Sequence, residues 1–332
     1  MEGKIAVPLD GSPLAETAFP FAIKLAKLTN AQLLLLRVTV LPVELEAAYN
    51  KENPDELMPL TYLEKVRVAI TNPAECVSLE LDQVEVKAIH GKFTYEIPEI
   101  AQAEGADLIV MTTHGLGGFT RLLLGSVTQQ ILRNSKLPVI VLRPNLVKEQ
   151  LKPISEPISF GQRPVTIAVP LDGDPASEAV LEPACRLAEK LKATVTLLRV
   201  VKNVQPILLD EPVMEILYSQ DDQSEDLRYR QDEARRYLSH LKESLAAYWQ
   251  NISFKTEVLT GTPAEKLVEW SGQTQPFLMA MATHARGGVG HILLGSVADE
   301  VMREAACPVL MTHINKDYQG WPRTATMVQT LK

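Results

Sequence analysis

The chain has 332 residues, 46% of them hydrophobic and 22% charged, which suits two globular domains with apolar cores. A net charge of -8 without a basic stripe argues against a nucleic-acid partner. Three cysteines (Cys76, Cys185 and Cys307) without paired spacing argue against a disulfide framework or a zinc cluster. We recognise no secretory signal and no apolar run of membrane-spanning length, so we expect a cytoplasmic protein without a membrane partner.

Strand and helix signals alternate from the start of the chain. The apolar run Ile5–Leu9 predicts a short strand. Ser12 can cap a helix with Pro13 in its first position, and apolar residues at helical spacing predict that this helix runs to about Thr29. The nearly continuous apolar run 32–40 then predicts a strand that is buried on both faces.

The same alternation continues through the first half. Residues 41–59 are rich in proline and acidic side chains, which predicts a loop over the strand ends. Further strands are expected at 84–89, 108–111 and 139–142, and further helices at 94–104 and 126–134. Strands that alternate with helices indicate a mostly parallel sheet.

The second half of the chain repeats the first. Val7-Pro8-Leu9-Asp10-Gly11 recurs as Val169-Pro170-Leu171-Asp172-Gly173, and Leu124-Gly125-Ser126-Val127 recurs as Leu294-Gly295-Ser296-Val297. Residues 202–226 repeat the loop after the second strand, and an amphipathic helix follows over 227–248. A period this long indicates domain duplication.

We therefore predict an α/β fold of two tandem doubly wound domains. Each would hold a five-stranded parallel sheet with helices on both faces. The expected boundaries are 1–145 for the first domain, 146–163 for a linker, 164–314 for the second domain and 315–332 for a tail.

Two features of each copy suit a nucleotide. Asp10 and Asp172 follow the first strand, where a carboxylate can accept from ribose hydroxyls. Gly125-Ser126 and Gly295-Ser296 open a helix, whose free N–H groups and dipole favour phosphate. A tight turn followed by a helix cap is the alternative interpretation of the same residues.

These motifs resemble the universal stress protein family in its tandem form. ATP-binding members carry G-x2-G-x9-G-[ST] after the fourth strand. The first copy reads Thr112-x2-Gly115-x9-Gly125-Ser126, and the second reads Ala282-x2-Ala285-x9-Gly295-Ser296. The first copy therefore departs from the motif at one glycine and the second at two.

The resemblance implies a binding role for particular residues. Pro8 and Asp10 would face adenosine, and Val38 would touch adenine. The rest of the first site would be Met111, Thr112, Gly115, Gly125, Ser126, Val127 and Thr128. The second site would comprise Pro170, Asp172, Val200, Met281, Ala282, Gly295, Ser296 and Val297. We predict no catalytic residue and no protein-held metal, and we interpret His114 and His284 as structural.

The resulting hypothesis is an ATP-binding stress-response protein with no hydrolysis or very slow hydrolysis, whose first domain is the better site because the second has lost two motif glycines. Mg²⁺ could accompany the ATP, and AMP or another adenosine nucleotide is an open alternative. Two other functions stay open: a weak Mg²⁺-dependent ATPase that uses Asp10 and Ser126, and a nucleotide-free dimerisation or regulatory module. The resemblance also implies pairing through the last strands, within the chain or in a homodimer.

Overall fold

The computed structural model describes most of both halves of the chain and divides into two compact units. The described residues are 3–39, 59–72, 79–90, 96–113, 125–143, 165–203, 220–283 and 295–313. Unit 1 comprises Met1–Arg163, Thr283–Leu293 and Cys307–His313, and unit 2 comprises Pro164–Ala282, Leu294–Ala306 and Ile314–Lys332.

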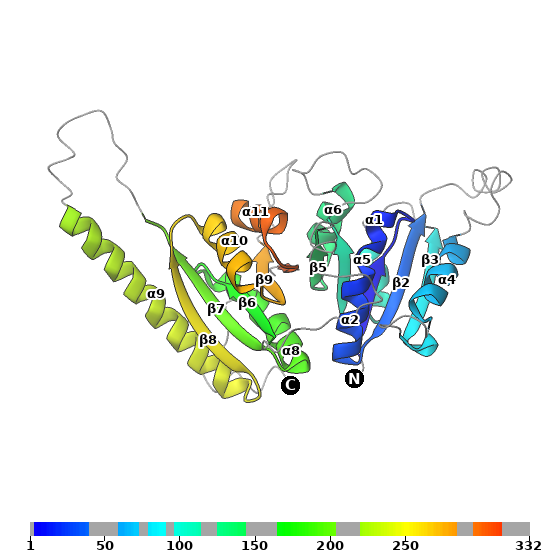
Figure 1. Ribbon diagram of the computed structural model, residues 1–332, viewed down its shortest axis with the longest axis horizontal. Coiled ribbons are helices and arrows are strands. Elements are labelled where there is room, and N and C mark those ends of the chain that lie inside the picture. Colours follow the sequence, from blue (N-terminus) through cyan, green and yellow to red (C-terminus); the bar gives the residue numbers. More distant parts are fainter. Residues whose placement is uncertain are drawn as a thin grey trace, which may run out of the picture. The chain divides into compact units, whose positions relative to one another are not determined.

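Unit 1 contains a parallel sheet with the strand order β3-β2-β1-β4-β5 (Figure 1). Its strands are β1 (Lys4–Pro8), β2 (Gln32–Thr39), β3 (Val84–His90), β4 (Leu108–Thr112) and β5 (Val139–Leu142). The last strand of the second copy, β10 (Val309–His313), also belongs to this unit and pairs antiparallel with β5. The two strands that close the two sequence copies therefore pair with each other.

Helices cover both faces of this sheet. They are α1 (Pro13–Glu16), α2 (Phe19–Thr29), α4 (Pro59–Ile70), α5 (Ile97–Ala103) and α6 (Ser126–Asn134), with a 3-10 turn η1 (Leu81–Gln83) before β3. The chain moves outward from β1 to β3 and then returns through β4 to β5. Because right-handed crossovers change face when this direction reverses, α2 and α4 lie on one face, and α5 and α6 on the other.

The single helix predicted from Pro13 to Thr29 is wrong. Ser12 caps α1 as predicted, since its side chain accepts from the Ala15 N–H at 3.1 Å, but α1 ends at Glu16 and α2 starts at Phe19. Pro20 supplies the reason. It has no N–H to donate to the carbonyl of Glu16, and its ring would clash with that carbonyl in a continuous helix.

Unit 2 repeats this topology with the strand order β9-β6-β7-β8, all parallel. Its strands are β6 (Thr166–Pro170), β7 (Thr194–Val201), β8 (Ser253–Thr260) and β9 (Leu278–Thr283). Its helices are η3 (Pro175–Val180, 3-10), α8 (Leu181–Leu191), α9 (Gln220–Tyr248), α10 (Pro263–Thr274) and α11 (Ser296–Glu304). Residues 220–226, expected as the end of a loop, form the first turns of α9 instead.

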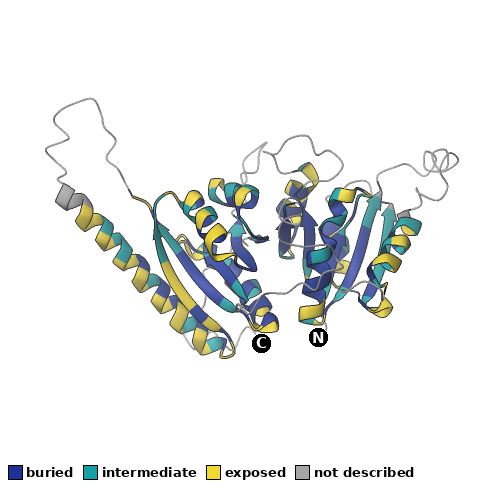
Figure 2. Cartoon of the chain, in the orientation of Figure 1, coloured by how far each residue is buried: buried dark blue, intermediate teal, exposed yellow. Residues whose placement is uncertain are grey.

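The cores consist of strand side chains enclosed by one apolar stripe of each helix (Figure 2). Leu33 to Leu36 in β2 are each at most 1% exposed, which fits the continuous apolar run of a strand covered on both faces. Cys185 and Cys307 are buried, and burial raises the pKa of the Cys185 thiol to about 12. Within the part of the chain that the structure describes, no helix is long and apolar enough to cross a membrane.

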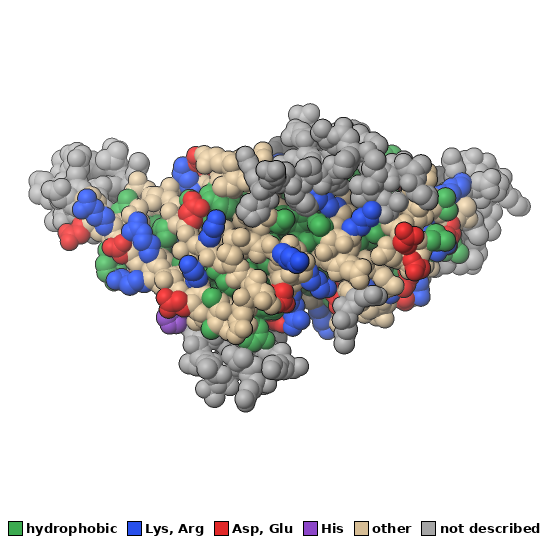
Figure 3. All heavy atoms as spheres, turned by 60° about the horizontal axis from the view of Figure 1, so that its bottom comes forward, with side chains coloured by type: hydrophobic (Ala, Val, Ile, Leu, Met, Phe, Trp, Pro, Cys, Tyr) green, Lys and Arg blue, Asp and Glu red, His purple; other side chains and the backbone are tan. Residues whose placement is uncertain are grey.

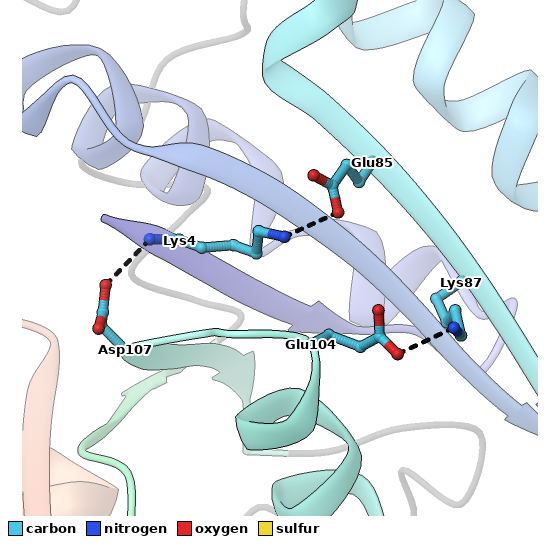
Figure 4. Close-up of polar contacts among 5 residues, drawn as sticks. All are labelled: Lys4, Glu85, Lys87, Glu104 and Asp107. Atoms are coloured by element: carbon cyan, nitrogen blue, oxygen red, sulfur yellow. Dashed lines mark hydrogen bonds and ion pairs between the residues drawn. The ribbon is translucent and has the colours of Figure 1, made fainter. Parts of the chain in front are cut away.

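Surface charges in unit 1 join elements around the amino ends of the strands (Figure 4). The Lys4 ammonium lies 2.8 Å from Glu85, and the Lys4 backbone N–H donates to Asp107 at 3.1 Å. Lys87 pairs with Glu104, also at 2.8 Å. Such exposed pairs contribute about 0–1 kcal/mol each. Figure 3 shows acidic and basic side chains interspersed in the same way over the face that it draws.

Lys24 gives a testable consequence of burial. It lies on α2 with 8% of its surface exposed, and burial lowers its pKa to about 8. The unfolded chain, with an ordinary lysine pKa of 10.5, binds more protons between pH 8 and 10.5, so this group makes unfolding less favourable as the pH rises through that window. We expect Lys24→Met to raise the free energy of unfolding at pH 7 by roughly 1–3 kcal/mol.

The measurement is chemical denaturation of the natural chain and of Lys24→Met at pH 7, 8.5 and 10. The stability gap between them should narrow as the pH rises. A gap that is independent of pH would contradict the role of the buried charge.

Candidate functional site

The carboxyl ends of three neighbouring strands define the candidate site of unit 1. β1 lies between β2 and β4, and the crossover after β1 leads to β2 while the crossover after β4 leads the opposite way, to β5. Ligands of open α/β sheets bind at such a switch point. Pro8 ends β1 opposite Leu36 of β2, and Pro8 and Val38 are both half-buried there. The topology therefore places Pro8, Asp10 and Val38 at one end of the sheet, as predicted.

Asp10 sits in a tight turn between β1 and α1. Its Oδ1 accepts from the Ser12 N–H at 2.9 Å and from the Ser12 hydroxyl at 2.6 Å. The next residue, Gly11, has a φ of +86°, which side chains other than that of glycine rarely adopt. These bonds fix the direction of the carboxylate at the end of β1.

The start of α6 is fastened to the end of β4. The Gly125 N–H donates to the Thr113 carbonyl at 2.9 Å, and the Gln129 N–H makes the first intrahelical bond, to Gly125. Among the described residues, the N–H groups of Ser126, Val127 and Thr128 have no recorded acceptor. Together with the exposed Ser126 hydroxyl, they form the donor set that an anion needs at a helix start.

Thr128 can offer a ligand only its backbone N–H, because its side chain is occupied within the fold. Its side chain is 2% exposed, and its hydroxyl lies 3.2 Å from the Thr112 carbonyl and 3.0 Å from the Thr113 carbonyl. The hydroxyl therefore holds α6 to β4. Met111 and Thr112 have buried side chains as well, at 7% and 4% exposure, and Gly115 lies outside the described residues.

The second site is arranged in the same way. Pro170 and Val200 are half-buried at the ends of β6 and β7, and Met281 is buried in β9 beside the half-buried Ala282. Asp172 is exposed and its Oδ1 accepts from the Asp174 N–H at 2.9 Å. Gly295, Ser296 and Val297 open α11. Ala285 lies outside the described residues.

The two helix starts nevertheless differ. Gly125 has φ -57° and ψ 146°, an ordinary extended conformation, whereas Gly295 has φ 89° and ψ 135°. Ala298 replaces Thr128 and lacks the hydroxyl that fastens α6 to β4.

The first turns of α6 and α11 also differ in charge. Asp299 and Glu300 stand in the first turns of α11, at the positions of Gln129 and Gln130 in α6. The Asp299 carboxylate pairs with Arg303 at 2.7 Å, and no ion pair of Glu300 is recorded within the described residues. The start of α11 is therefore more negative than the start of α6.

A polar cluster that the sequence analysis missed lies beside the Asp10 turn. The Arg37 guanidinium on β2 stacks over the Tyr62 ring of α4, with 4.8 Å from its carbon to the ring centroid. The Tyr62 hydroxyl donates to Glu16 of α1 at 2.7 Å. Burial, with the Glu16 bond, raises the pKa of Tyr62 well above its usual range, so the hydroxyl stays a donor. The guanidinium also occupies the space beside Gly11, 3.3 to 3.6 Å from where a Cβ would stand.

Unit 2 contains the same cluster. The Arg199 guanidinium lies 5.9 Å from the Tyr237 ring centroid, and the Tyr237 hydroxyl donates to the fully buried Glu178 at 2.8 Å. Guanidinium atoms stand 2.5 to 3.0 Å from where a Cβ on Gly173 would be. We call these groups the Arg–Tyr–Glu clusters of the two units.

One signal in the sequence could have revealed these clusters. Arg37 and Arg199 share the offset that relates Asp10 to Asp172, and so do Glu16 and Glu178. The tyrosines do not share it, because the segments after the second strand differ in length between the copies.

The backbone difference between the helix starts gives a prediction. Gly295→Ala should lower the free energy of unfolding of unit 2 by about 1–3 kcal/mol, because its φ and ψ are nearly confined to glycine while no atom lies within 4 Å of a new Cβ. Gly125→Ala is the matched control, since any residue adopts its backbone conformation. Thermal and denaturant unfolding of both variants measure the effect, and equal losses would contradict it.

Comparison with known proteins places the chain in a family. The model of the universal stress protein family matches residues 1–143 and 165–313. A universal stress protein of Mycobacterium tuberculosis is 25% identical over 328 residues, covering 94% of this chain and 96% of the relative. The crystal structure of a universal stress protein from Archaeoglobus fulgidus superposes with a TM-score of 0.58 and 19% identity over 93% of this chain and 98% of that one. The crystal structure of a functionally unknown protein from Pseudomonas aeruginosa superposes with a TM-score of 0.54 and 17% identity, over 94% of this chain and 92% of that one. The two structures support the doubly wound fold, and the family match over both halves shows that the chain belongs to the universal stress protein family, with two copies of its domain in tandem.

Proposed function

We propose that unit 1 binds ATP and hydrolyses it slowly or not at all, as part of a stress response in the cytoplasm. The observation that carries this proposal is the start of α6 beside the end of β4, where three successive N–H groups have no recorded acceptor among the described residues and Ser126 is exposed. Such a group of donors, at the positive end of a helix dipole, suits a phosphate chain.

The nucleoside would lie toward β1 and β2. Asp10 is held in a fixed direction by two bonds to Ser12, and a carboxylate in that position can accept from ribose hydroxyls. Pro8 and Val38 offer half-buried apolar surface at the same strand ends, which suits an adenine ring.

Binding without rapid hydrolysis follows from the side chains available. Among the described residues, no group of three or more histidines, cysteines or carboxylates could hold a metal ion. Mg²⁺ would then arrive with the triphosphate, coordinated mainly by phosphate oxygens and water. Asp10 accepts from Ser12 through Oδ1, which positions its carboxylate as an acceptor for the ribose.

Unit 2 would bind ATP more weakly. Its helix start lacks the threonine hydroxyl that anchors α6 and carries Asp299 and Glu300 where α6 has two glutamines. Carboxylates near a helix start oppose an incoming phosphate chain.

Loss of the Asp10 carboxylate should test the site directly. We expect Asp10→Ala to weaken ATP binding at least about tenfold, because a charge-assisted hydrogen bond contributes roughly 1.5–3 kcal/mol. Calorimetric titration of the full chain measures this, and Asp82→Ala, an exposed carboxylate on η1, is the control.

Two further measurements distinguish ATP binding from the two alternative functions, a nucleotide-free module and a weak ATPase. Mass spectrometry of the ligand released from the denatured chain identifies the nucleotide, and its absence together with a lack of ATP binding would favour a nucleotide-free module. Steady phosphate release by the natural chain, lost in Asp10→Ala, would favour a weak ATPase instead.

A further inference from the structure

The outer edge of the unit 1 sheet is the strand β3. It ends the strand order and, among the described strands, pairs with β2 alone. In a parallel ladder, alternate residues point their N–H and C=O groups away from the neighbouring strand, so the part of β3 around Val86 presents such groups at this edge. The pairing through last strands is already made inside unit 1, by β5 and β10. A further strand could therefore pair with unit 1 at β3.

The side chains of β3 favour one register for a second copy of the same strand. Glu85 and Lys87 stand two residues apart and so point to the same face of the sheet. In an antiparallel pair of β3 strands centred on Val86, each Glu85 lies opposite the Lys87 of the other copy. A centre at residue 85 or 87 would instead place like charges opposite each other. A guarded edge rejects a partner in every register, whereas these two charges reject some registers and favour one.

Both charges keep room for a second partner. The Glu85 carboxylate lies 2.8 Å from the Lys4 ammonium, and the Lys87 ammonium lies 2.8 Å from the Glu104 carboxylate (Figure 4). The side chains of Glu85 and Lys87 are nevertheless 45% and 44% exposed. A carboxylate accepts from several donors, and an ammonium donates three hydrogen bonds. Ion pairs between two copies would therefore add to the pairs within unit 1.

Exposed apolar side chains flank the same edge. Leu60 and Val68 on α4 are 51% and 63% exposed, and Leu81 in η1, shortly before β3, is 55% exposed. Leu60 and Val68 are eight residues apart and share one flank of their helix. Tyr62 lies on the other flank, where it meets Arg37 of β2. The flank with Leu60 and Val68 therefore faces away from β2, toward the outer edge of the sheet.

One two-fold axis would satisfy all of these surfaces together. α4 packs against β3, so an axis through Val86 and normal to the sheet would bring two α4 helices side by side on one face (Figure 1). The helices would run antiparallel, with Leu60 of one copy toward Val68 of the other. Backbone groups, charges and apolar surface would then each meet their complement, as an interface between identical copies requires.

The edge of unit 2 lacks this combination. β8 also ends the strand order and carries Lys255 and Glu257 at the same spacing. Residues 255–257 are exposed, and Tyr229 is the only large apolar side chain that the described part of α9, the helix packed against β8, exposes. The two edges therefore share their charge pattern but differ in apolar surface.

We propose that β3, together with the flank of α4 that carries Leu60 and Val68, is a docking surface for a second copy of this chain, joined by antiparallel β3–β3 pairing centred on Val86. The inference is independent of the proposed function, because none of these residues belongs to the candidate nucleotide site.

Charge exchange across the paired strands tests the register. In sedimentation velocity at concentrations up to about 0.1 mM, the full chain should show a reversible equilibrium between monomer and dimer. Glu85→Lys would place lysine opposite lysine twice in the dimer, and Lys87→Glu would place glutamate opposite glutamate. Each should weaken association at least about tenfold. An equimolar mixture of the two variants should associate as the natural chain does, because every cross-strand pair is then of unlike charge.

Two further variants locate the contact. Val68→Glu should weaken association about tenfold, because it places a charge in the apolar flank. Lys255→Glu on β8 is the matched control for Lys87→Glu and should leave association unchanged. A melting curve checks that each variant folds.

The proposal is overturned if the natural chain stays monomeric over this concentration range, in which case β3 is a guarded edge. Dimers that survive both single substitutions on β3, that fail to return in the mixture of folded variants, or that are lost in Lys255→Glu would overturn it as well, since each result places the contact elsewhere.

Discussion

The burial of parallel strands on both faces is the constraint on which the rest of each unit depends. A strand such as β2, whose Leu33 to Leu36 are almost completely enclosed, has no polar face to present to water. Charged and hydrogen-bonding side chains that serve a ligand can therefore stand only where the strands end. At the carboxyl ends, the reversal of the chain beside β1 separates the crossover connections and leaves room between them.

The same constraint confines the polar groups to the two ends of the sheet, and the groups at each end have different roles. Around the amino ends of unit 1, the Lys4 ammonium pairs with Glu85 and the Lys4 N–H donates to Asp107, so these contacts join elements of the fold to one another. At the carboxyl ends, Asp10 is fixed by Ser12, and Tyr62 is fixed by Glu16, in partly buried surroundings. Groups fixed in this way lose little further freedom when a ligand binds, which is the advantage of a preformed site.

The sequence predicted most of the fold because strand burial and helix capping are local signals. The Ser126–Asn134 helix and the Val139–Leu142 strand have the predicted bounds, and the repeated Asp-Gly turns lie at the predicted strand ends. The apolar period does not predict the helix break after Glu16, because apolar residues keep their helical spacing across Pro20. The Arg–Tyr–Glu clusters depend on contacts between residues far apart in the chain, which no local pattern contains. The resemblance places Thr128 in the first site, and the structure shows that its hydroxyl bonds to carbonyls at the end of β4.

Duplication gives each unit a reference for interpreting the other. Thr128, which anchors α6, is matched by Ala298 in a unit of the same topology, so the fold does not require that hydroxyl. The arginine, tyrosine and glutamate, in contrast, occur in both units, although such groups are costly to bury and Glu178 is fully buried. Their presence at both Asp-Gly turns, beside helix starts that differ in charge and in glycine conformation, shows that the turn after the first strand is held in a similar way in each unit while the helix starts differ.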